Sequence, residues 1–526
     1  MLVDEIEIAR LGLQRQLDEG RAQAERNRLG QFATPTALAT DILHCARSLL
    51  PPDEPVRFLD PALGTGSFYS ALLRVFPSTH TADAEGFEID PYYGKHAAEL
   101  WHGTSLKLRM EDFTKADPPP TSRANLLICN PPYVRHHHLA AHEKERLQRR
   151  VQAELGIRVS GLTGLYCYFL LLSHQWMAEN ALAAWLIPSE FMDVNYGQAI
   201  KNYLLRRVNL IRIHRFDPNQ AQFDDALVSS AVVWFRKAAP GGESVTFSYG
   251  GSLETPAISK PVPRTLLSSA SKWTRLPRAN EATNGQARIR LSDLFKIQRG
   301  IATGANSFFV LTEERAQQYE IPSAFLQPIL PSPRLLQASE IRADASGVPI
   351  LDRKLYLLNC DLPESEVKSR YPALWGYLQL GVETGISARY LCTHRSPWYA
   401  QEKRPAAPFV CTYMSRQRDG GGKLFRFILN RSNATAANVY LMLYPKPKLQ
   451  RLLDKRPELV EQIWEALNRF EPDTLRDEGR VYGGGLHKLE PKELGNAPAG
   501  MILETLPDGA FSVPQQASLI FVGEQE

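Results

Sequence analysis

The sequence runs Asn125-Leu126-Leu127-Ile128-Cys129-Asn130-Pro131-Pro132-Tyr133 near the end of its first quarter. A short apolar run bounded by polar residues and proline is typical of a buried strand in a parallel sheet. The residues that follow would then lie just beyond the carboxyl end of that strand, where open α/β sheets bind their ligands. We therefore expect Asn130 to Tyr133 to form a functional loop at the edge of such a sheet.

The residue types of this loop suit the binding of a planar amino group. Pro131 and Pro132 have fixed φ angles and no N–H, so the turn is stiff and its carbonyl groups stay available as acceptors. The Asn130 side-chain oxygen and the Pro131 carbonyl can both accept hydrogen bonds from one NH₂ group. An amino group held in this way loses conjugation with its ring and becomes nucleophilic, while Tyr133 offers a flat face for stacking. For an isolated Asn-Pro-Pro-Tyr, a polar turn with an exposed tyrosine is the alternative.

A second motif, Asp60-Pro61-Ala62-Leu63-Gly64-Thr65-Gly66-Ser67-Phe68, follows a predicted strand at Val56–Leu59. Gly64 and Gly66 allow a ligand to approach the backbone closely. The third glycine of a dinucleotide-binding fingerprint is missing, and Asp60 stands at the end of the strand. A carboxylate there suits the amino group of S-adenosylmethionine and would repel a pyrophosphate. This loop therefore favours a methyltransferase over a nicotinamide-dependent enzyme.

Together the two motifs resemble the cofactor-binding loop and the catalytic loop of N6-adenine DNA methyltransferases. Their order resembles the gamma arrangement of type II restriction–modification enzymes, in which a C-terminal recognition domain follows the catalytic loop. The resemblance covers essentially the whole chain, more loosely beyond residue 290. It implies S-adenosylmethionine as cofactor, no metal, and methylation of an adenine flipped out of double-stranded DNA. The catalytic residues would be Asn130, Pro131, Pro132 and Tyr133.

The resemblance also implies which residues bind the cofactor. Thr34, predicted as a helix N-cap with Pro35 at the first helical position, belongs to a segment that would hold the methionine end. Glu88, at the end of the second strand, would accept hydrogen bonds from both ribose hydroxyls. In a later loop, one carboxylate would bond the adenine amino group and one aromatic ring would pack on the adenine. With the glycine-loop residues, these complete the predicted set: Asp60, Ala62, Gly64, Gly66, Asp112 and Phe113.

The target base and the DNA have predicted contacts too. By resemblance, Tyr133 and Phe223 would stack on the two faces of the target adenine, with Phe216 as the competitor for the second position. Arg135 is predicted to lie near a DNA phosphate. A basic and aromatic stretch in the C-terminal half supplies groups that can read base edges or bind phosphates, namely Arg416, Arg418 and Lys423. A basic surface loop is the alternative for each of these three.

The chain is too long for one comfortable core, so more than one domain is expected. We predict an N-terminal helical arm at residues 1–29 and a doubly wound, Rossmann-like α/β methyltransferase domain at 30–237. A linker rich in Pro, Ser and Gly is predicted at 238–285. A mixed α/β target-recognition domain, opened by the family-like segment Phe295–Asn306, is predicted at 286–526.

The composition is that of an ordinary soluble protein. The formal net charge of +4 permits nucleic-acid binding but does not demand it, so local basic patches must carry that function. The six cysteines are scattered without a CxxC pair, and we find no secretory leader. We therefore expect a reduced cytoplasmic location and no structural zinc. No apolar run is long enough to cross a bilayer, so no membrane partner is expected.

Three alternative functions remain open at this point. Similar Asn-Pro-Pro-Tyr loops methylate glutamine amides in proteins, and RNA adenine is another planar amino substrate. The third alternative is a non-catalytic DNA-recognition subunit, against which the intact catalytic loop argues. We find no Pro-Asp…Asp/Glu-x-Lys nuclease cluster, so we expect a monomer whose cognate restriction endonuclease is a separate protein acting on the same site.

Overall fold

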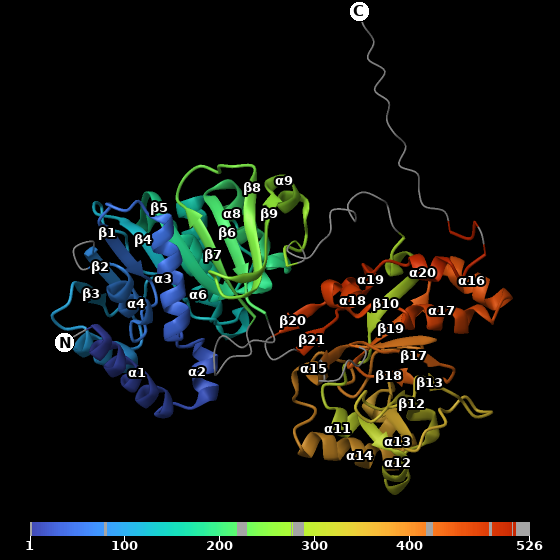
Figure 1. The fold of residues 1–526 in the computed structure, drawn as a ribbon. Helices are drawn as coiled ribbons and strands as arrows, with labels where there is room; N and C mark the ends of the chain where they lie inside the picture. Colours follow the sequence, from blue (N-terminus) through green and yellow to red (C-terminus); the bar gives the residue numbers. More distant parts are fainter. Residues whose placement is uncertain are drawn as a thin grey trace, which may run out of the picture. The chain divides into compact units, whose positions relative to one another are not determined.

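The computed structural model describes residues 3–77, 81–217, 229–274, 276, 289–416, 424–482, 486–507 and 509–511. The chain divides into two compact units (Figure 1). Unit 1 comprises residues 1–282 with 482–485, and unit 2 comprises residues 283–481 with 486–526. Each unit has its own buried apolar core. No helix among the described residues is long and apolar enough to cross a membrane.

Unit 1 is built on one nine-stranded sheet in the order β3-β2-β1-β4-β5-β7-β6-β8-β9. Its first five strands in space are parallel, and β7 then runs antiparallel to both β5 and β6. This order is that of a doubly wound, Rossmann-like fold, as predicted. The strands are β1 (Val56–Asp60), β2 (Thr81–Phe87), β3 (Leu106–Arg109), β4 (Ala124–Cys129), β5 (Met177–Pro188), β6 (Asn209–Arg215), β7 (Ser230–Arg236), β8 (Ser244–Gly251) and β9 (Pro256–Pro263).

The helices of unit 1 pack in two groups. α1 contacts α4 and α5, and α3 packs on α4, whereas α7 contacts both α6 and α8. Every residue of β4 is buried between these layers, which explains why its sequence is a continuous apolar run. The helices are α1 (Val3–Glu19), α2 (Gln23–Leu29), α3 (Thr36–Leu49), α4 (Ser67–Val75), α5 (Pro91–Leu100), α6 (Ala141–Leu155), α7 (Leu165–Leu172), α8 (Gln198–Arg206) and α9 (Arg264–Ser269).

The prediction of a linker at residues 238–285 is wrong for much of that range. β8 and β9 continue the catalytic sheet, and Trp273 is fully buried against Phe247. The prolines of β9, which suggested a linker, are tolerated because β9 is the edge strand of the sheet. Residues 277–285 lie outside the described residues.

Unit 2 contains three smaller sheets, in the orders β10-β19-β15-β17-β13, β11-β14-β12-β18 and β16-β21-β20. Its strands are short and interrupted, as its Gly- and Pro-rich sequence indicates. They are β10 (Phe295–Arg299), β11 (Val310–Thr312), β12 (Leu326–Leu330), β13 (Glu340–Ile341), β14 (Leu355–Leu358), β15 (Phe409–Thr412), β16 (Met414–Arg416), β17 (Phe427–Asn430), β18 (Thr435–Ala436), β19 (Tyr440–Pro445), β20 (Arg480–Tyr482) and β21 (Leu486–Lys488).

The helices of unit 2 are mostly short and surround these sheets (Figure 1). α17 packs on β17 and α19 on β10, which buries one face of the largest sheet. The helices are α10 (Leu291–Leu294), α11 (Asn306–Phe309), α12 (Glu313–Gln318), α13 (Glu364–Arg370), α14 (Pro372–Glu383), α15 (Tyr390–Thr393), α16 (Pro447–Lys455), α17 (Leu459–Asn468), α18 (Pro472–Glu478), α19 (Pro491–Gly495) and α20 (Gly500–Leu503).

Candidate active site

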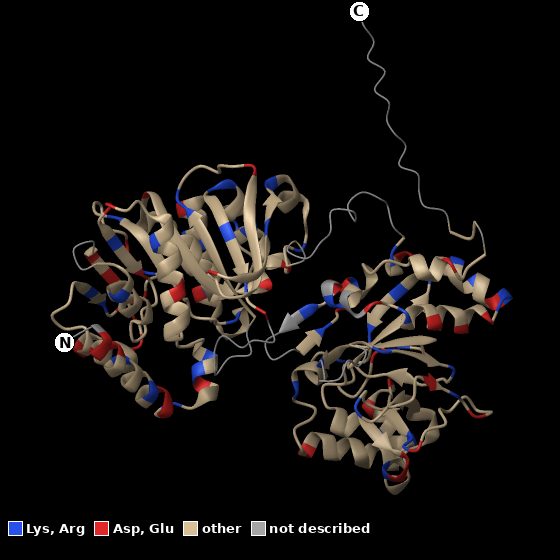
Figure 2. Cartoon of the chain, viewed as in Figure 1, with Lys and Arg blue, Asp and Glu red and all other residues tan. Residues whose placement is uncertain are grey.

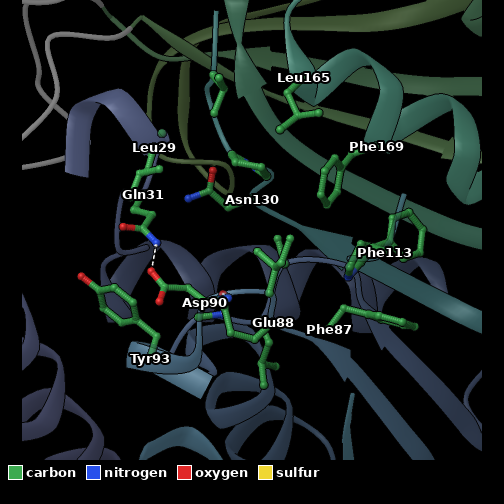
Figure 3. Close-up of a pocket in the computed structure, with 18 of the residues that line it drawn as sticks. Leu29, Gln31, Phe87, Glu88, Asp90, Tyr93, Phe113, Asn130, Leu165 and Phe169 are labelled. Carbon is green, nitrogen blue, oxygen red and sulfur yellow. Dashed lines mark hydrogen bonds between the residues drawn. The ribbon is translucent and has the colours of Figure 1, made fainter. Parts of the chain in front are cut away.

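A cavity of about 610 Å³ opens at the carboxyl ends of β1, β2 and β4 in unit 1. It brings together the glycine loop, the residues after β2, the loop at Glu111–Thr114 and the start of the Asn130 loop. Figure 3 shows Phe87, Phe113 and Phe169 toward one side of it and polar residues toward the other. The edge position follows from the parallel sheet, because the turns after neighbouring parallel strands meet there.

The Asn130 side chain is held in one orientation. Its amide nitrogen donates to the Phe32 carbonyl and to Thr34 Oγ1, both at 3.0 Å. Its carbonyl oxygen is buried and has no hydrogen-bond partner among the residues that the structure describes. A buried acceptor without a partner is costly, so this oxygen is prepared for a donor supplied by a ligand.

The rest of this loop contributes differently. Pro132 lines the cavity, whereas Pro131 and Tyr133 do not. The Tyr133 hydroxyl donates to the Leu186 carbonyl at 3.0 Å, and its ring centroid lies 5.6 Å from that of Phe32. Tyr133 is therefore a well-anchored, largely buried ring, and its hydroxyl is already engaged with β5.

The glycine loop places its residues in two different roles. Asp60, Ala62 and Gly64 line the cavity, and a Cβ on Gly64 would meet nothing within 4 Å. Gly66 does not line the cavity, so the close approach of a ligand there stays a prediction. A Cβ on Gly66 would instead lie 2.5 Å from the Trp101 indole nitrogen, and its φ of +88° favours glycine.

Two carboxyl groups accept hydrogen bonds from the backbone of this loop, the buried Asp60 and the half-buried Glu88. The Asp60 side chain accepts a hydrogen bond from the Ala62 amide at 3.1 Å, and Glu88 accepts from the Gly64 and Asp90 amides at 3.0 and 2.7 Å. Burial raises the pKa of both groups to about 7, and the neighbouring Glu88 charge adds to the effect on Asp60. This arrangement favours a ligand that brings hydrogen-bond donors or positive charge.

The aromatic side of the cavity is built around Phe113. Its ring centroid lies 5.3 Å from Phe87, 5.5 Å from Phe169 and 5.3 Å from Trp176. Asp112 precedes it, and its Oδ1 accepts from the Thr114 amide and hydroxyl at 2.9 and 2.7 Å. A flat apolar ring fits this side, with a fixed carboxylate at its edge.

The structure corrects the predicted N-cap at Thr34. α3 begins at Thr36 and its N-cap position is Pro35, which makes no side-chain cap. Thr34 lies one residue further out, lines the cavity, and accepts the Asn130 amide instead. The helix start was misplaced because the preference of proline for the first helical position does not exclude it from the N-cap.

Several cavity residues were not predicted from the sequence. Gln14 and Asp18 come from α1, and Gln31 donates to Asp90 at 2.8 Å beside Tyr93 (Figure 3). Their local sequences carry no motif. The one available signal was the spacing of polar residues on one face of the predicted N-terminal helix.

The predicted DNA contacts are only partly described. Arg135 and Arg416 are both exposed, the first after the catalytic loop and the second at the end of β16. Phe216 is buried and packs edge-on to His214, as a core residue does. Phe223, Arg418 and Lys423 lie outside the described residues.

Comparison with known proteins gives the family. The model of the Eco57I restriction-modification methylase matches residues 111–223, and that of the type II methyltransferase M.Eco57I C-terminal domain matches residues 274–515. Type II methyltransferase M.AccI of Acinetobacter calcoaceticus is 25% identical over 509 residues, which cover 94% of this chain and 88% of that protein. M.XamI of Xanthomonas campestris pv. amaranthicola is 28% identical over 450 residues, covering 84% and 80%. The chain is similar to the type II restriction–modification methyltransferases over most of its length.

A solved structure supports the fold of this methyltransferase. The type IIL restriction-modification enzyme MmeI, determined in complex with DNA, superposes with a TM-score of 0.52 at 13% identity. The match covers 96% of this chain and 76% of that one. The two chains therefore share the Rossmann-like domain followed by a mixed α/β domain.

We predict that Asp60→Asn stabilises the ligand-free methyltransferase at high pH. The folded-state pKa of Asp60, about 7, lies above the ordinary 3.8, so the carboxyl group costs stability as the pH rises through that window. Asparagine keeps an acceptor for the Ala62 amide and carries no charge. The melting temperature should exceed that of wild type by several degrees at about pH 8, and by much less at about pH 4.5.

Asp53→Asn is the matched control, because it removes an exposed carboxylate just before the same strand. Its melting temperature should not rise above that of wild type by more at about pH 8 than at about pH 4.5. Equal gains from Asp60→Asn at both pH values would show that the effect does not come from ionisation of the buried carboxyl.

Proposed function

We propose that this methyltransferase acts as a monomer that transfers the methyl group of S-adenosylmethionine to N6 of an adenine in double-stranded DNA. The adenine would be flipped out of the helix, which costs a few kcal/mol of stacking and pairing. The observation that carries the proposal is the buried Asn130 oxygen without a partner. Asn130 lines the cavity, and its carbonyl oxygen still lacks an N–H donor among the described residues.

Asn130 and the following prolines would hold the reacting amino group. The Asn130 oxygen and the Pro131 carbonyl accept its two N–H bonds, which leaves the nitrogen lone pair directed at the methyl carbon. S-adenosylmethionine supplies that methyl group on a positively charged sulfur. The C–N bond forms as the C–S bond breaks with its electron pair going to sulfur, and the extra proton leaves to water. Positioning supplies most of the rate, so no strong general base is needed.

The cofactor would lie along the cavity from its aromatic to its polar side. The Phe113 ring packs on the adenine, and Asp112 Oδ2 accepts its amino group. Each Glu88 oxygen accepts one backbone amide and keeps a lone pair for a ribose hydroxyl. Asp60 faces the methionine ammonium, and the segment at Thr34 completes that end together with Ala62 and Gly64.

Unit 2 would recognise the DNA target. Figure 2 shows Lys and Arg on the small sheet of β16, β21 and β20, which includes Arg416 and Lys488. Next to it, the Arg299 guanidinium lies 4.1 Å from the Tyr413 ring centroid and Lys488 Nζ lies 5.2 Å from it. An exposed arginine among other cations suits base edges and phosphates. Arg135 in unit 1 would contact a phosphate.

A separate endonuclease would cleave the same site when it is unmethylated. The support is the family itself, since the matching models and the curated relatives are described as restriction–modification methyltransferases. The methyltransferase would then protect the DNA of its own cell in the cytoplasm. Modified DNA should therefore resist the partner nuclease.

The substrate class can be tested directly. We expect the protein, incubated with methyl-labelled S-adenosylmethionine, to produce N6-methyldeoxyadenosine in unmethylated duplex DNA and nothing in RNA or a protein extract. Mass spectrometry of nucleosides and peptides reads the product, and sequencing of the modified DNA gives the site. Label in RNA, on glutamine, or in none of the three would overturn the proposed substrate.

We predict that Asn130→Ala abolishes methyl transfer and keeps cofactor binding. The variant loses the acceptor for the amino group, which should lower kcat by at least about a hundredfold, as removal of one transition-state hydrogen bond does. Affinity for S-adenosylhomocysteine should stay within about threefold of wild type, because Asn130 faces the target base.

The control for this variant is Asn202→Ala, which truncates an exposed asparagine on α8. It should methylate DNA at the wild-type rate. Wild-type turnover by Asn130→Ala would refute the assigned role.

We predict that Arg416→Ala weakens binding to the cognate DNA by about 1–3 kcal/mol if the side chain reads a base edge. If it binds a phosphate instead, affinity should fall on all sequences and the salt dependence should become shallower. Fluorescence anisotropy at several salt concentrations distinguishes the two. The control is Arg451→Ala, which truncates an exposed arginine on α16. If Arg416→Ala binds DNA as tightly as this control does, the recognition surface lies elsewhere.

A further inference from the structure

The first helix forms one wall of the cavity. Glu7, Arg10, Gln14 and Asp18 are spaced three or four residues apart, so they share one face of α1. Gln14 and Asp18 line the cavity, together with Thr65 and Ser67 of the glycine loop. The N-terminal arm is therefore part of the site as well as of the packing.

Hydrogen bonds orient both cavity residues of α1. Gln14 Oε1 accepts from the Thr65 hydroxyl at 2.6 Å, and Gln14 Nε2 donates to Asp18 Oδ2 at 2.9 Å. Asp18 Oδ1 accepts from the Tyr93 hydroxyl at 2.9 Å. Asp18 Oδ1 also lies 3.6 Å from Arg26 Nη1, whereas the Gln14 amide keeps a second N–H and Asp18 Oδ2 can accept a further bond.

These residues belong to the polar side of the cavity. In Figure 3, Gln31, Asp90 and Tyr93 lie on the side opposite Phe87, Phe113 and Phe169. Because the Tyr93 hydroxyl bonds to Asp18, α1 meets the cavity at this polar side. If the aromatic side takes an adenine ring, the group that reaches α1 is the other end of the same ligand.

We propose that Asp18 and Gln14 bind the amino-acid end of S-adenosylmethionine, Asp18 its ammonium and Gln14 its carboxylate. The inference rests on the proposed function, because it assumes that ligand. An ammonium has three N–H donors, so it can serve Asp18 as well as Asp60. Charge-assisted hydrogen bonds of this kind are short and strong, and they distinguish a cofactor with an amino-acid end from one without it.

Glu7 and Arg10 are the positioning residues of this wall. Arg10 Nε and Nη2 both donate to the Glu7 carboxylate at 2.7 Å, and Arg10 is 1% exposed. Arg10 Nη1 also donates to the Thr65 and Ser67 hydroxyls at 3.2 and 3.0 Å. Burial opposes ionisation of Glu7, but hydrogen bonds from Arg10, Ser70 and Thr36 lower its pKa to about 2. The charged pair thus ties α1 to the glycine loop and to α4.

Two ligands that differ only at the amino-acid end test the proposal. S-adenosylhomocysteine carries that end, and 5′-methylthioadenosine lacks it. We expect Asp18→Asn in the full-length protein to weaken the binding of S-adenosylhomocysteine by about tenfold or more. The affinity for 5′-methylthioadenosine should stay within about twofold of wild type, and isothermal titration calorimetry measures both. Gln14→Ala should show the same selectivity.

Glu19→Gln is the matched control, because it removes one charge from an exposed position of the same helix. It should change neither affinity. If Asp18→Asn loses affinity equally for both ligands, or for neither, the proposed role of α1 is wrong. This holds even if the wild type binds the cofactor and methylates DNA. A wild type that binds neither ligand would overturn the proposed function, and this inference with it.

Arg10→Lys tests the positioning role separately. Lysine keeps the charge but cannot make the forked contact to Glu7. We expect the KM for S-adenosylmethionine to rise several-fold while kcat at saturating cofactor changes little, at temperatures well below the measured melting point. A fall in kcat with an unchanged KM would show that Arg10 does not position Gln14 and Asp18 for cofactor binding.

Discussion

Two hydrogen bonds from the Asn130 amide nitrogen, to the Phe32 carbonyl and to Thr34 Oγ1, decide which way the Asn130 carbonyl oxygen faces. The Phe32 carbonyl can only accept, so the amide nitrogen must point toward it and the oxygen must point away. The Asn130 loop therefore depends on a segment almost a hundred residues earlier in the chain. That segment is fixed in turn, since Gly30 accepts the Tyr133 amide at 3.2 Å and leaves no room for a Cβ beside it.

The buried carboxyl groups show a cost that the ligand-free protein bears for function. Removal from water disfavours the charged form of Asp60 and of Glu88. Burial therefore raises the pKa of each carboxyl group to about 7. A ligand that brings an ammonium or hydroxyl donors offsets this cost on binding. Active sites commonly sacrifice stability in this way, because groups optimal for the folded chain alone would not bind the ligand. Glu7 shows the opposite case, since its partner Arg10 is supplied by the chain itself.

Local motifs were the part of the site that the sequence could predict. The strand β4 and the loop after it could be recognised because their apolar run, prolines and amide are adjacent in the chain. The wall formed by Gln14 and Asp18 could not, because it depends on a contact between α1 and the glycine loop that no local pattern encodes. β8 and β9 were mistaken for a linker because proline content was weighed without knowing that β9 lies at the sheet edge. The target-stacking position Phe223 stays a prediction.

The geometry of the catalytic loop also limits what that loop can select. In the proposed mechanism, an acceptor amide and a proline carbonyl would hold any planar NH₂ group, so they would not by themselves distinguish one adenine in DNA from another. Sequence discrimination needs base-edge contacts worth about 1–3 kcal/mol each, summed over several positions. Unit 1 places polar groups in its own cavity, whereas unit 2 carries exposed arginines on short strands, such as Arg416 on β16 and Arg299 on β10. In the proposed function, chemistry and target choice are therefore separated into two units, so the target sequence could change through unit 2 while the Asn130 geometry stays constant.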